Sequence, residues 1–469
     1  MTIPRKFQAE CIREINDLNG RAILACDPGL GKTLMALVYG KWKVKGPIVV
    51  VCPADSKIHW AREAQKHIGR RVEILNGMTP NQELTKGNKI WVINYEILGI
   101  PRPGKATWTS QLKKINPELV VCDECHAIKT PTAKRSRAVK LLTQKVPKVL
   151  MLSGTPLVSR PMELWFQVHI VKPDLFPSRH EYGVAYCDGH LGGFGWDYSG
   201  ASNLKNLHKI LMNEVMVRRK KDEVLTELPP KIRTVVPVEI AKPDMTEYKK
   251  AVKEFLVWLE ERDPAAAKRA MMAERIVQLG YLKRLAAQGK IPMVNRIIES
   301  FLNDSQQKLI VFAVHTKFIQ ALKDRFKDDC IVVDGKVPTN KRQALYDKFN
   351  KSKSCPLLVG NLQAAGVVWS CTASSTVYFA EMGWRPGDHI QAADRVRGID
   401  RGTGVPVDER WIVAEDTIEV DLCKILQEKQ KVLTSVLDGR NTKELDIYTQ
   451  LENAMVARHG NGRKRRNGP

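Results

Sequence analysis

The sequence has no apolar stretch that approaches the roughly 20 residues a transmembrane helix needs. Its N-terminus also has no apolar run of the kind that signal peptides carry. We therefore expect a chain that stays inside the cell and has no membrane partner.

A disulfide framework is also missing. The ten cysteines are scattered, and several of them, such as Cys26, Cys52 and Cys122, lie in or beside apolar runs that look like strands. Such cysteines are typical of reduced, buried thiols in a cell interior. The sequence contains no internal repeat either, which argues against a solenoid.

Acidic residues are scarce relative to basic ones. The chain has 75 Lys and Arg against 51 Asp and Glu, a formal charge of +24 over 469 residues. This charge favours a polyanionic partner, and nucleic acid over a membrane. The length exceeds one ordinary core and favours two domains. We expect a cytoplasmic, nucleoid-associated protein, or a nuclear one if the source is a eukaryote.

Among the motifs present, a phosphate-binding loop organises the N-terminal part. A short apolar strand over residues 22–25 precedes a loop with Gly29 and Gly31, followed by Lys32, Thr33 and a helical pattern. The glycines let backbone N–H groups surround phosphate oxygens, Lys32 would reach the terminal phosphates, and Thr33 would hold Mg²⁺. The general pattern has glycine where this chain has Cys26.

The expected nucleotide site is wider than these four residues. Gln8, on a short helix before the loop, is a candidate for reading adenine through its side-chain amide, although a Gln in such a place is often only solvated. The full nucleotide-binding set that we predict is Gln8, Asp27, Pro28, Gly29, Leu30, Gly31, Lys32, Thr33 and Leu34.

A second motif, Val120-Val-Cys-Asp-Glu-Cys-His126, places carboxylates at the end of a strand. Asp123 is expected to bind Mg²⁺, and Glu124 to orient and deprotonate the attacking water. The same letters spell C-x-x-C-H, a haem-attachment or redox pattern, but the buried strand and the phosphate loop favour the carboxylate interpretation.

The next motif, Leu152-Ser-Gly-Thr-Pro156, ends another strand in hydroxyl residues. Ser153 and Thr155 would hydrogen-bond Asp123 or His126 and so couple the nucleotide to the rest of the fold. A simple polar turn explains this stretch equally well.

Strand-like and helical runs alternate along the chain, which predicts βαβ units and doubly wound parallel sheets. A second alternation begins near residue 308 and has no phosphate loop of its own. We expect Arg395 and Arg397, from Gln391-Ala-Ala-Asp-Arg-Val-Arg397, to act as arginine fingers, although ordinary surface charge is the usual role of such residues. The expected domains are residues 1–235 with a helical insertion, a helical protrusion or linker over 236–295, a second lobe over 296–440 and a disordered basic tail over 441–469.

Taken together, DPGLGKT, VVVCPADSKIHW, VINYEIL, DECH, LSGTP and QAADRVRGIDR resemble the superfamily-two helicases, and more closely their SWI/SNF-like double-strand DNA translocases. Between these motifs, FGWDYSGASNLKNLHKIL and VYFAEMGWRPGDHIQ are similar to the annealing-helicase, or fork-remodelling, members. The family usually has a second arginine at the place of Gly398.

The resemblance implies two RecA-like doubly wound lobes with helical insertions, ATP and Mg²⁺ as cofactors, and double-stranded or branched DNA as partner. It implies catalytic roles for Lys32, Asp123, Glu124 and Arg395, and Arg397 is a candidate substitute for the missing arginine. We assign coupling roles to His126, Ser153, Thr155 and Gln391. The expected function is an ATP-dependent DNA translocase or helicase that anneals strands, migrates branches or remodels forks.

Two alternatives remain at this point. One is a helicase that separates the strands of DNA or RNA. The other, motivated by Cys26 and Gly398, is a nucleic-acid-binding regulator with a vestigial ATPase. We expect a monomer, and the sequence identifies no protein partner.

Overall fold

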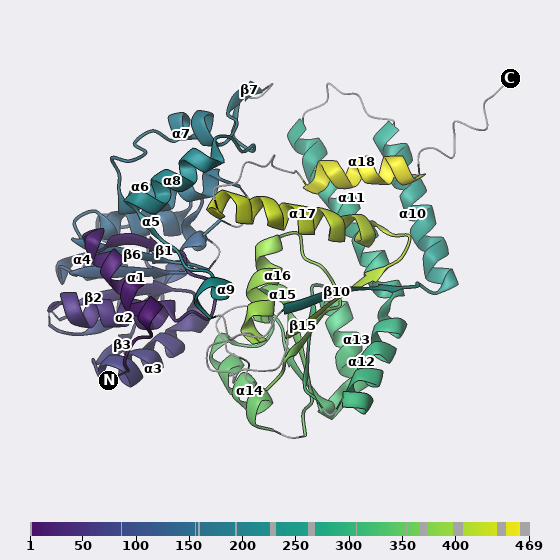
Figure 1. Cartoon of the computed structure of the whole chain (residues 1–469), viewed down its shortest axis with the longest axis horizontal. Helices are drawn as coiled ribbons and strands as arrows, with labels where there is room; N and C mark the ends of the chain where they lie inside the picture. Colours follow the sequence, from purple (N-terminus) through teal and green to yellow (C-terminus); the bar gives the residue numbers. More distant parts are fainter. Residues whose placement is uncertain are drawn as a thin grey trace. The chain divides into compact units, whose positions relative to one another are not determined.

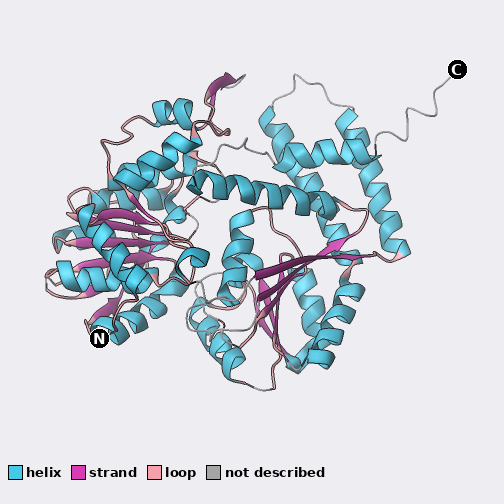
Figure 2. Cartoon of the chain, viewed as in Figure 1, coloured by secondary structure: helices cyan, strands magenta, loops and turns pink. Residues whose placement is uncertain are grey.

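The computed structural model describes residues 2–85, 87–154, 156–157, 160–192, 195–225, 231–260, 268–305, 307–352, 354–365, 371, 373–396, 407–438 and 447–459. The chain divides into two compact units, the first formed mainly by residues 1–228 and the second mainly by residues 229–397 and 404–431. Figure 1 labels the elements along the chain, and Figure 2 distinguishes its helices from its strands.

The first unit is built on a seven-stranded parallel sheet with the strand order β3-β4-β2-β5-β6-β1-β9. All five residues of β2 are buried, as expected for a strand that helices cover on both faces. The strands are β1 Arg21–Leu24, β2 Ile48–Cys52, β3 Val72–Ile74, β4 Ile90–Asn94, β5 Leu119–Asp123, β6 Lys148–Leu152 and β9 Met216–Val217.

Helices in this unit follow the apolar periodicity of the sequence. Helix α1 buries Phe7, Cys11, Ile12 and Ile15 on one face. Helix α3 ends at Gly69, whose φ of 64° gives the left-handed conformation that favours glycine. The helices are α1 Lys6–Asp17, α2 Lys32–Lys43, α3 Lys57–Ile68, α4 Trp108–Lys114, α5 Lys134–Thr143, α6 Met162–Val171, α7 Arg179–Tyr186, α8 Leu204–Glu214 and α9 Lys221–Val224. An antiparallel hairpin of β7 His190–Gly192 and β8 Gly195–Asp197 forms a separate small sheet.

The second unit contains a six-stranded parallel sheet with the order β10-β15-β14-β11-β13-β12. Its strands are β10 Lys231–Val238, β11 Leu309–Ala313, β12 Cys330–Val333, β13 Leu357–Asn361, β14 Thr376–Phe379 and β15 Val407–Ala414. Its helices are α10 Lys242–Glu260, α11 Lys268–Gly289, α12 Ile291–Ser305, α13 Thr316–Phe326, α14 Thr339–Lys351, α15 Leu362–Ala365, α16 Pro386–Ala393, α17 Ile418–Asp438 and α18 Ile447–His459. The two sheets confirm the predicted α/β class with two doubly wound lobes.

The segment around residue 235 differs in detail from the expected domain division. Residue 235 falls inside β10, an edge strand of the second sheet, and the units divide between residues 228 and 229. Helices α10 and α11 bury Tyr248, Phe255 and Leu279 in the same apolar cluster as Trp411 of β15. These helices therefore belong to the core of the second unit.

The expectation of a disordered tail from residue 441 is wrong for part of that stretch. Helix α18 lies within it and buries Leu451 and Met455 completely. Arg458 donates a hydrogen bond to Asp421 of α17 at 2.7 Å and another to the Thr417 carbonyl at 3.1 Å. The reason is that apolar residues at helical spacing precede the basic end, which lies outside the described residues. In the part of the chain that the structure describes, no helix combines the length and apolarity needed to cross a membrane.

A buried ion pair joins α11 to α17 in the second unit. Lys290, which follows α11 directly, and Glu419 are both fully buried, with 2.5 Å between Nζ and Oε2. Lys290 also donates to the Ile412 carbonyl at 2.8 Å, and Glu419 accepts from the Ala414 N–H at 2.9 Å. Each charge therefore has its partner and a backbone hydrogen bond, although Glu419 Oε1 is buried without a hydrogen-bond partner.

We expect Lys290→Met to lower the free energy of unfolding by about 3–5 kcal/mol, because it leaves the Glu419 carboxylate buried without its partner. Urea unfolding followed by circular dichroism would show this as a lower midpoint. Adding Glu419→Gln should recover part of the loss. The control is Lys253→Met on the exposed side of α10, and an equal cost for both single variants would contradict the argument.

Candidate functional site

The loop between β1 and α2 has the form that phosphate binding requires. Gly29 and Gly31 have φ values of 82° and 81°, and Gly31 is the N-cap of α2. Lys32, Thr33 and Leu34 form the first turn of the helix, where backbone N–H groups point outward. Cys26 does not have a positive φ, so the residue at this place need not be glycine.

Gln8 lies directly against this loop. Its Nε2 donates to the Leu30 carbonyl at 3.0 Å, and its Oε1 accepts from the Arg5 N–H at 2.9 Å. A Cβ on Gly31 would stand 2.5 Å from Gln8 Nε2, so the close approach depends on glycine. The Gln8 side chain is buried, and its amide forms hydrogen bonds within the protein. Its contact with adenine remains a prediction.

The segment after β9 holds the other side of the loop, a role that the sequence analysis missed. The Asp27 N–H donates to the Arg219 carbonyl at 3.0 Å, and Asp27 Oδ2 accepts from the Lys221 N–H at 3.0 Å. Lys32 Nζ donates to the carbonyls of Cys26 at 2.9 Å and Asp27 at 3.4 Å. The lysine thus folds back over the loop, where an anion could draw it outward.

Asp123, the last residue of β5, is held by two aromatic side chains. Trp60 Nε1 of α3 donates to Asp123 Oδ2 at 2.8 Å, and the Tyr95 hydroxyl donates to the Asp123 carbonyl at 2.7 Å. Burial and then the neighbouring Glu124 charge raise the pKa of Asp123 to about 6, while the hydrogen bond from Trp60 and then the charge of Lys32 act in the opposite direction. The sequence analysis assigned no role to Trp60. Its position shortly after a buried strand was the signal that could have placed it near the site.

Glu124 adopts an unusual backbone conformation, with φ of 48° and ψ of 54°. Non-glycine residues in the left-handed region are uncommon and often lie at functional sites. Glu124 Oε2 lies 3.3 Å from His126 Nδ1 and 3.4 Å from Ser153 Oγ, and the latter two atoms are 3.4 Å apart. The predicted contact between Ser153 and His126 is therefore present, whereas Thr155 lies outside the described residues.

Two further observations bring these motifs together. A Cβ on Gly154 would lie 2.5 Å from Pro28 Cγ, so the loop after β6 packs directly on the phosphate loop. Cys125 Sγ donates to Gln167 Oε1 at 3.0 Å, and both Cys122 and Cys125 are buried. The described residues contain no cluster of three or more metal-ligating side chains, and the buried thiols offer no support for the haem or redox interpretation.

The structure describes some of the site residues that the sequence predicts in the second unit. Gln391 is buried on α16, and Arg395 belongs to the short 3₁₀ helix Asp394–Val396 that follows it. The Arg395 side chain, Arg397 and Gly398 lie outside what the structure describes. Their roles remain predictions.

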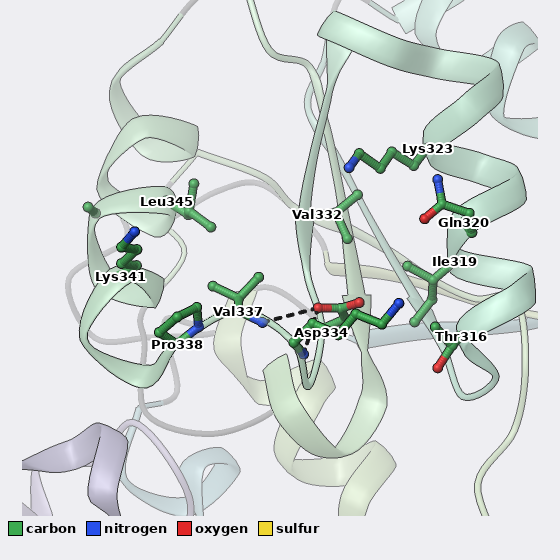
Figure 3. A pocket seen from close by; sticks show the side chains of 12 residues that line it. Thr316, Ile319, Gln320, Lys323, Val332, Asp334, Val337, Pro338, Lys341 and Leu345 are labelled. Atoms are coloured by element: carbon green, nitrogen blue, oxygen red, sulfur yellow. Dashed lines mark hydrogen bonds between the residues drawn. The ribbon is translucent and has the colours of Figure 1, made fainter.

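The second unit also contains a basic groove of about 750 Å³, which we call the lysine groove (Figure 3). It is lined by Thr316, Ile319, Gln320 and Lys323 of α13, by Val332, Asp334, Lys336, Val337 and Pro338 on and after β12, and by Lys341, Ala344 and Leu345 of α14. Asp334 Oδ1 accepts from the N–H groups of Lys336 at 3.0 Å and Val337 at 3.3 Å, so its carboxylate holds the turn. The three lysines give the groove a net positive charge.

Comparison with known families matches two domain models to the chain. The SNF2-related domain matches residues 9–291, and the Helicase conserved C-terminal domain matches residues 289–398. These matches confirm the resemblance that the motifs indicated.

Curated relatives show the same relationship. The chain is 31% identical over 439 residues to the mouse (Mus musculus) DNA annealing helicase and endonuclease ZRANB3, covering 91% of the chain and 40% of that protein. It is 32% identical over 433 residues to the Xenopus tropicalis SWI/SNF-related matrix-associated actin-dependent regulator of chromatin subfamily A-like protein 1, covering 91% of the chain and 44% of that protein. The chain thus spans less than half the length of these relatives.

Among solved structures, the Sulfolobus solfataricus SWI2/SNF2 ATPase core in complex with dsDNA is similar at 22% identity and a TM-score of 0.44, with 93% of each chain covered. The family assignment does not depend on this likeness. It rests on the SNF2-related model, which spans more than half of the sequence and shows that the chain belongs to the SNF2-related family.

Proposed function

We propose that this chain is an ATP-dependent translocase or helicase that acts on duplex or branched DNA. It would anneal strands, migrate branches or remodel forks in replication, recombination or repair. The supporting observation is that the phosphate loop, Asp123 and Glu124 meet at one edge of the first sheet, in a chain whose relatives include proteins named DNA annealing helicases. We further propose that it acts as a monomer at the nucleoid, or in the nucleus of a eukaryote.

The residues around the phosphate loop fit a magnesium nucleotide. The Thr33 hydroxyl and the Asp123 carboxylate are hard oxygen donors, the kind that Mg²⁺ prefers. The raised pKa of the partly exposed Asp123 carboxylate supports this assignment, because a nearby cation would stabilise its ionised form. Bound Mg²⁺ would neutralise negative charge on the triphosphate.

Within this site the other residues take separate roles. The backbone N–H groups of Gly29, Gly31, Lys32 and Thr33 would surround the phosphates, and the Lys32 side chain would leave its carbonyl partners to contact the terminal phosphates. Glu124 would orient and deprotonate the attacking water, and its contacts with His126 and Ser153 support this role. The pair His126 and Ser153 would then sense whether a nucleotide is present.

The second unit would contribute positive charge. We propose that Lys323, Lys336 and Lys341 in the lysine groove contact DNA phosphates, which carry no base information. We retain Arg395 and Arg397 as proposed arginine fingers, and Gln391 and Thr155 as proposed coupling residues. We also retain Gln8 as the proposed adenine-reading residue.

We expect Glu124→Gln to lower the DNA-stimulated rate of ATP hydrolysis by roughly 100-fold or more, because the variant has lost its general base. Phosphate release would be measured without nucleic acid and with single-stranded, duplex and forked DNA. DNA binding should persist, since the substitution changes no residue of the lysine groove. Glu83→Gln, an exposed glutamate in the same unit, is the matched control.

The same assay separates the proposal from its alternatives. Stimulation by duplex or forked DNA supports a translocase. Stimulation only by single strands or RNA would favour a strand-separating helicase. DNA binding without turnover would favour a regulator with a vestigial ATPase.

The pH dependence of stability gives an independent test of Asp123. Its raised pKa of about 6 contributes stability that is present below the ordinary carboxyl pKa near 4 and is lost as the pH rises through 6. Without nucleotide, Asp123→Asn should therefore raise the free energy of unfolding at pH 7.5 by about 1–2 kcal/mol. Urea unfolding should show the difference shrinking between pH 6 and pH 4. A constant difference, or a loss of stability at pH 7.5, would show that Asp123 is not a strained carboxylate.

The lysine groove makes a further prediction. Replacing Lys323, Lys336 and Lys341 together by alanine should weaken DNA binding about equally for all sequences and reduce the slope of log K against log [salt] by roughly 2–3. Fluorescence anisotropy titrations at several salt concentrations would measure both. The matched control removes three exposed lysines of α10 instead, Lys249, Lys250 and Lys253. Equal effects of the two triple variants would show that only total charge matters.

A further inference from the structure

The hairpin formed by β7 and β8 presents large apolar side chains to solvent. In its antiparallel register Leu191 stands directly opposite Trp196, so the two side chains share one face of the ribbon. Leu191 is 73% exposed and Trp196 is 49% exposed. In Figure 2 the hairpin extends away from the helices of its unit. We call the exposed side chains of Leu191 and Trp196 the hairpin face.

A tightly packed base holds this hairpin in place. A Cβ on Gly183 would stand 2.3 Å from Tyr198 Cδ1, and one on Gly200 would stand 2.6 Å from Asp188 Cβ. The Asp188 N–H also donates to Ser202 Oγ at 3.0 Å. The glycines of this segment therefore let its chains approach closely. A base of this kind explains the local sequence but gives no reason for an exposed tryptophan at the other end.

The rings next to Trp196 form an ordered group. Trp196 and Tyr198 are parallel to within 6°, with ring centroids 6.2 Å apart, and His180 of α7 meets Trp196 edge-on at 4.4 Å. His180 Nδ1 lies 2.6 Å from the Tyr198 hydroxyl. The Arg179 guanidinium lies 5.4 Å from the centre of the Tyr198 ring. Trp196 is thus held by neighbouring rings while about half of its surface stays open.

Titratable groups of both signs lie around the same place. Burial would raise the pKa of Asp197, but hydrogen bonds from Ser199 and the nearby charges of His190 and Arg160 lower it. Arg179 adds a positive charge next to the rings. Held aromatic rings together with cations are the combination with which proteins bind unpaired bases, because every base has a π-face and a charged backbone.

We propose that the hairpin face stacks against an unpaired base of DNA where a duplex opens into single strands. This inference rests on the proposed function and names the part of a branched DNA that the first unit would recognise. Stacking accepts any base, which fits a protein that recognises the form of the DNA and not its sequence. The Arg179 guanidinium beside the rings favours a DNA strand, which carries a phosphate backbone, over an apolar protein segment as the occupant.

Binding of three labelled DNAs to the whole chain tests this inference. The DNAs are a duplex, a fork of the same length with thymine arms, and the same fork with abasic sites at the first unpaired position of each arm. Trp196→Ala should raise the Kd for the intact fork about five- to tenfold and leave the Kd for the duplex within twofold. Trp196→Phe should retain most of the affinity. The control is Trp42→Ala, which removes a tryptophan that is 56% exposed on α2.

The abasic fork makes the test specific to stacking. With the wild-type protein the abasic sites should raise the Kd as much as Trp196→Ala does, and with the variant they should add nothing. An unchanged Kd of Trp196→Ala for the fork, or an equal change for duplex and fork, would overturn the inference. Additive effects of Trp196→Ala and the abasic sites would also overturn it. So would binding of a protein segment at this face if the abasic sites had no effect on the Kd. If wild-type protein shows neither DNA binding nor DNA-stimulated hydrolysis, the proposed function fails first. If the wild type binds DNA and shows DNA-stimulated hydrolysis but Trp196→Ala leaves the Kd for the fork unchanged, only the hairpin inference fails.

Discussion

The candidate site depends on the parallel register of three neighbouring strands. Leu152 of β6 pairs with Leu24 of β1 on one side and with Asp123 of β5 on the other, so all three strands end at the same level. The phosphate loop, Glu124 and Ser153 therefore follow at one edge of the sheet, where doubly wound folds bind their ligands. A shift of one residue between β5 and β6 would turn the Asp123 side chain to the other face of the sheet.

The features that the sequence predicted correctly are those written in short segments. The apolar runs at β2 and β5 and the loop with Gly29 and Gly31 carry their structure in their own residues. The features it missed depend on residues far apart in the chain. Strand β9 has two residues and no visible pattern, yet its continuation reaches Asp27 through Arg219. The hydrogen bond from Trp60 to Asp123 joins two elements that no local rule connects.

Cys26 shows how a departure from a motif can be harmless to the fold. The general pattern has glycine there, but positive φ in this loop falls on Gly29 and Gly31. The Cys26 side chain can therefore turn into the apolar cluster of Cys11 and Leu30, where its contact with the Cys11 thiol and its burial raise its pKa. A neutral thiol in this place packs like a small apolar side chain. The backbone conformation and burial of Cys26 thus show that this departure from the motif does not distort the phosphate loop.

Asp123 and two buried glutamates of the second unit differ in the direction in which the fold shifts their pKa. In the second unit, burial would raise the pKa of Glu409 and Glu381, but Lys231 and Arg233 lower the former and His315 lowers the latter. Each of these carboxylates has side-chain partners inside the protein. The pKa of Asp123 is instead raised, because burial and the Glu124 charge outweigh the hydrogen bond from Trp60 and the charge of Lys32. The raised pKa of Asp123 agrees with the role proposed for this carboxylate, which is to bind the magnesium ion of the nucleotide.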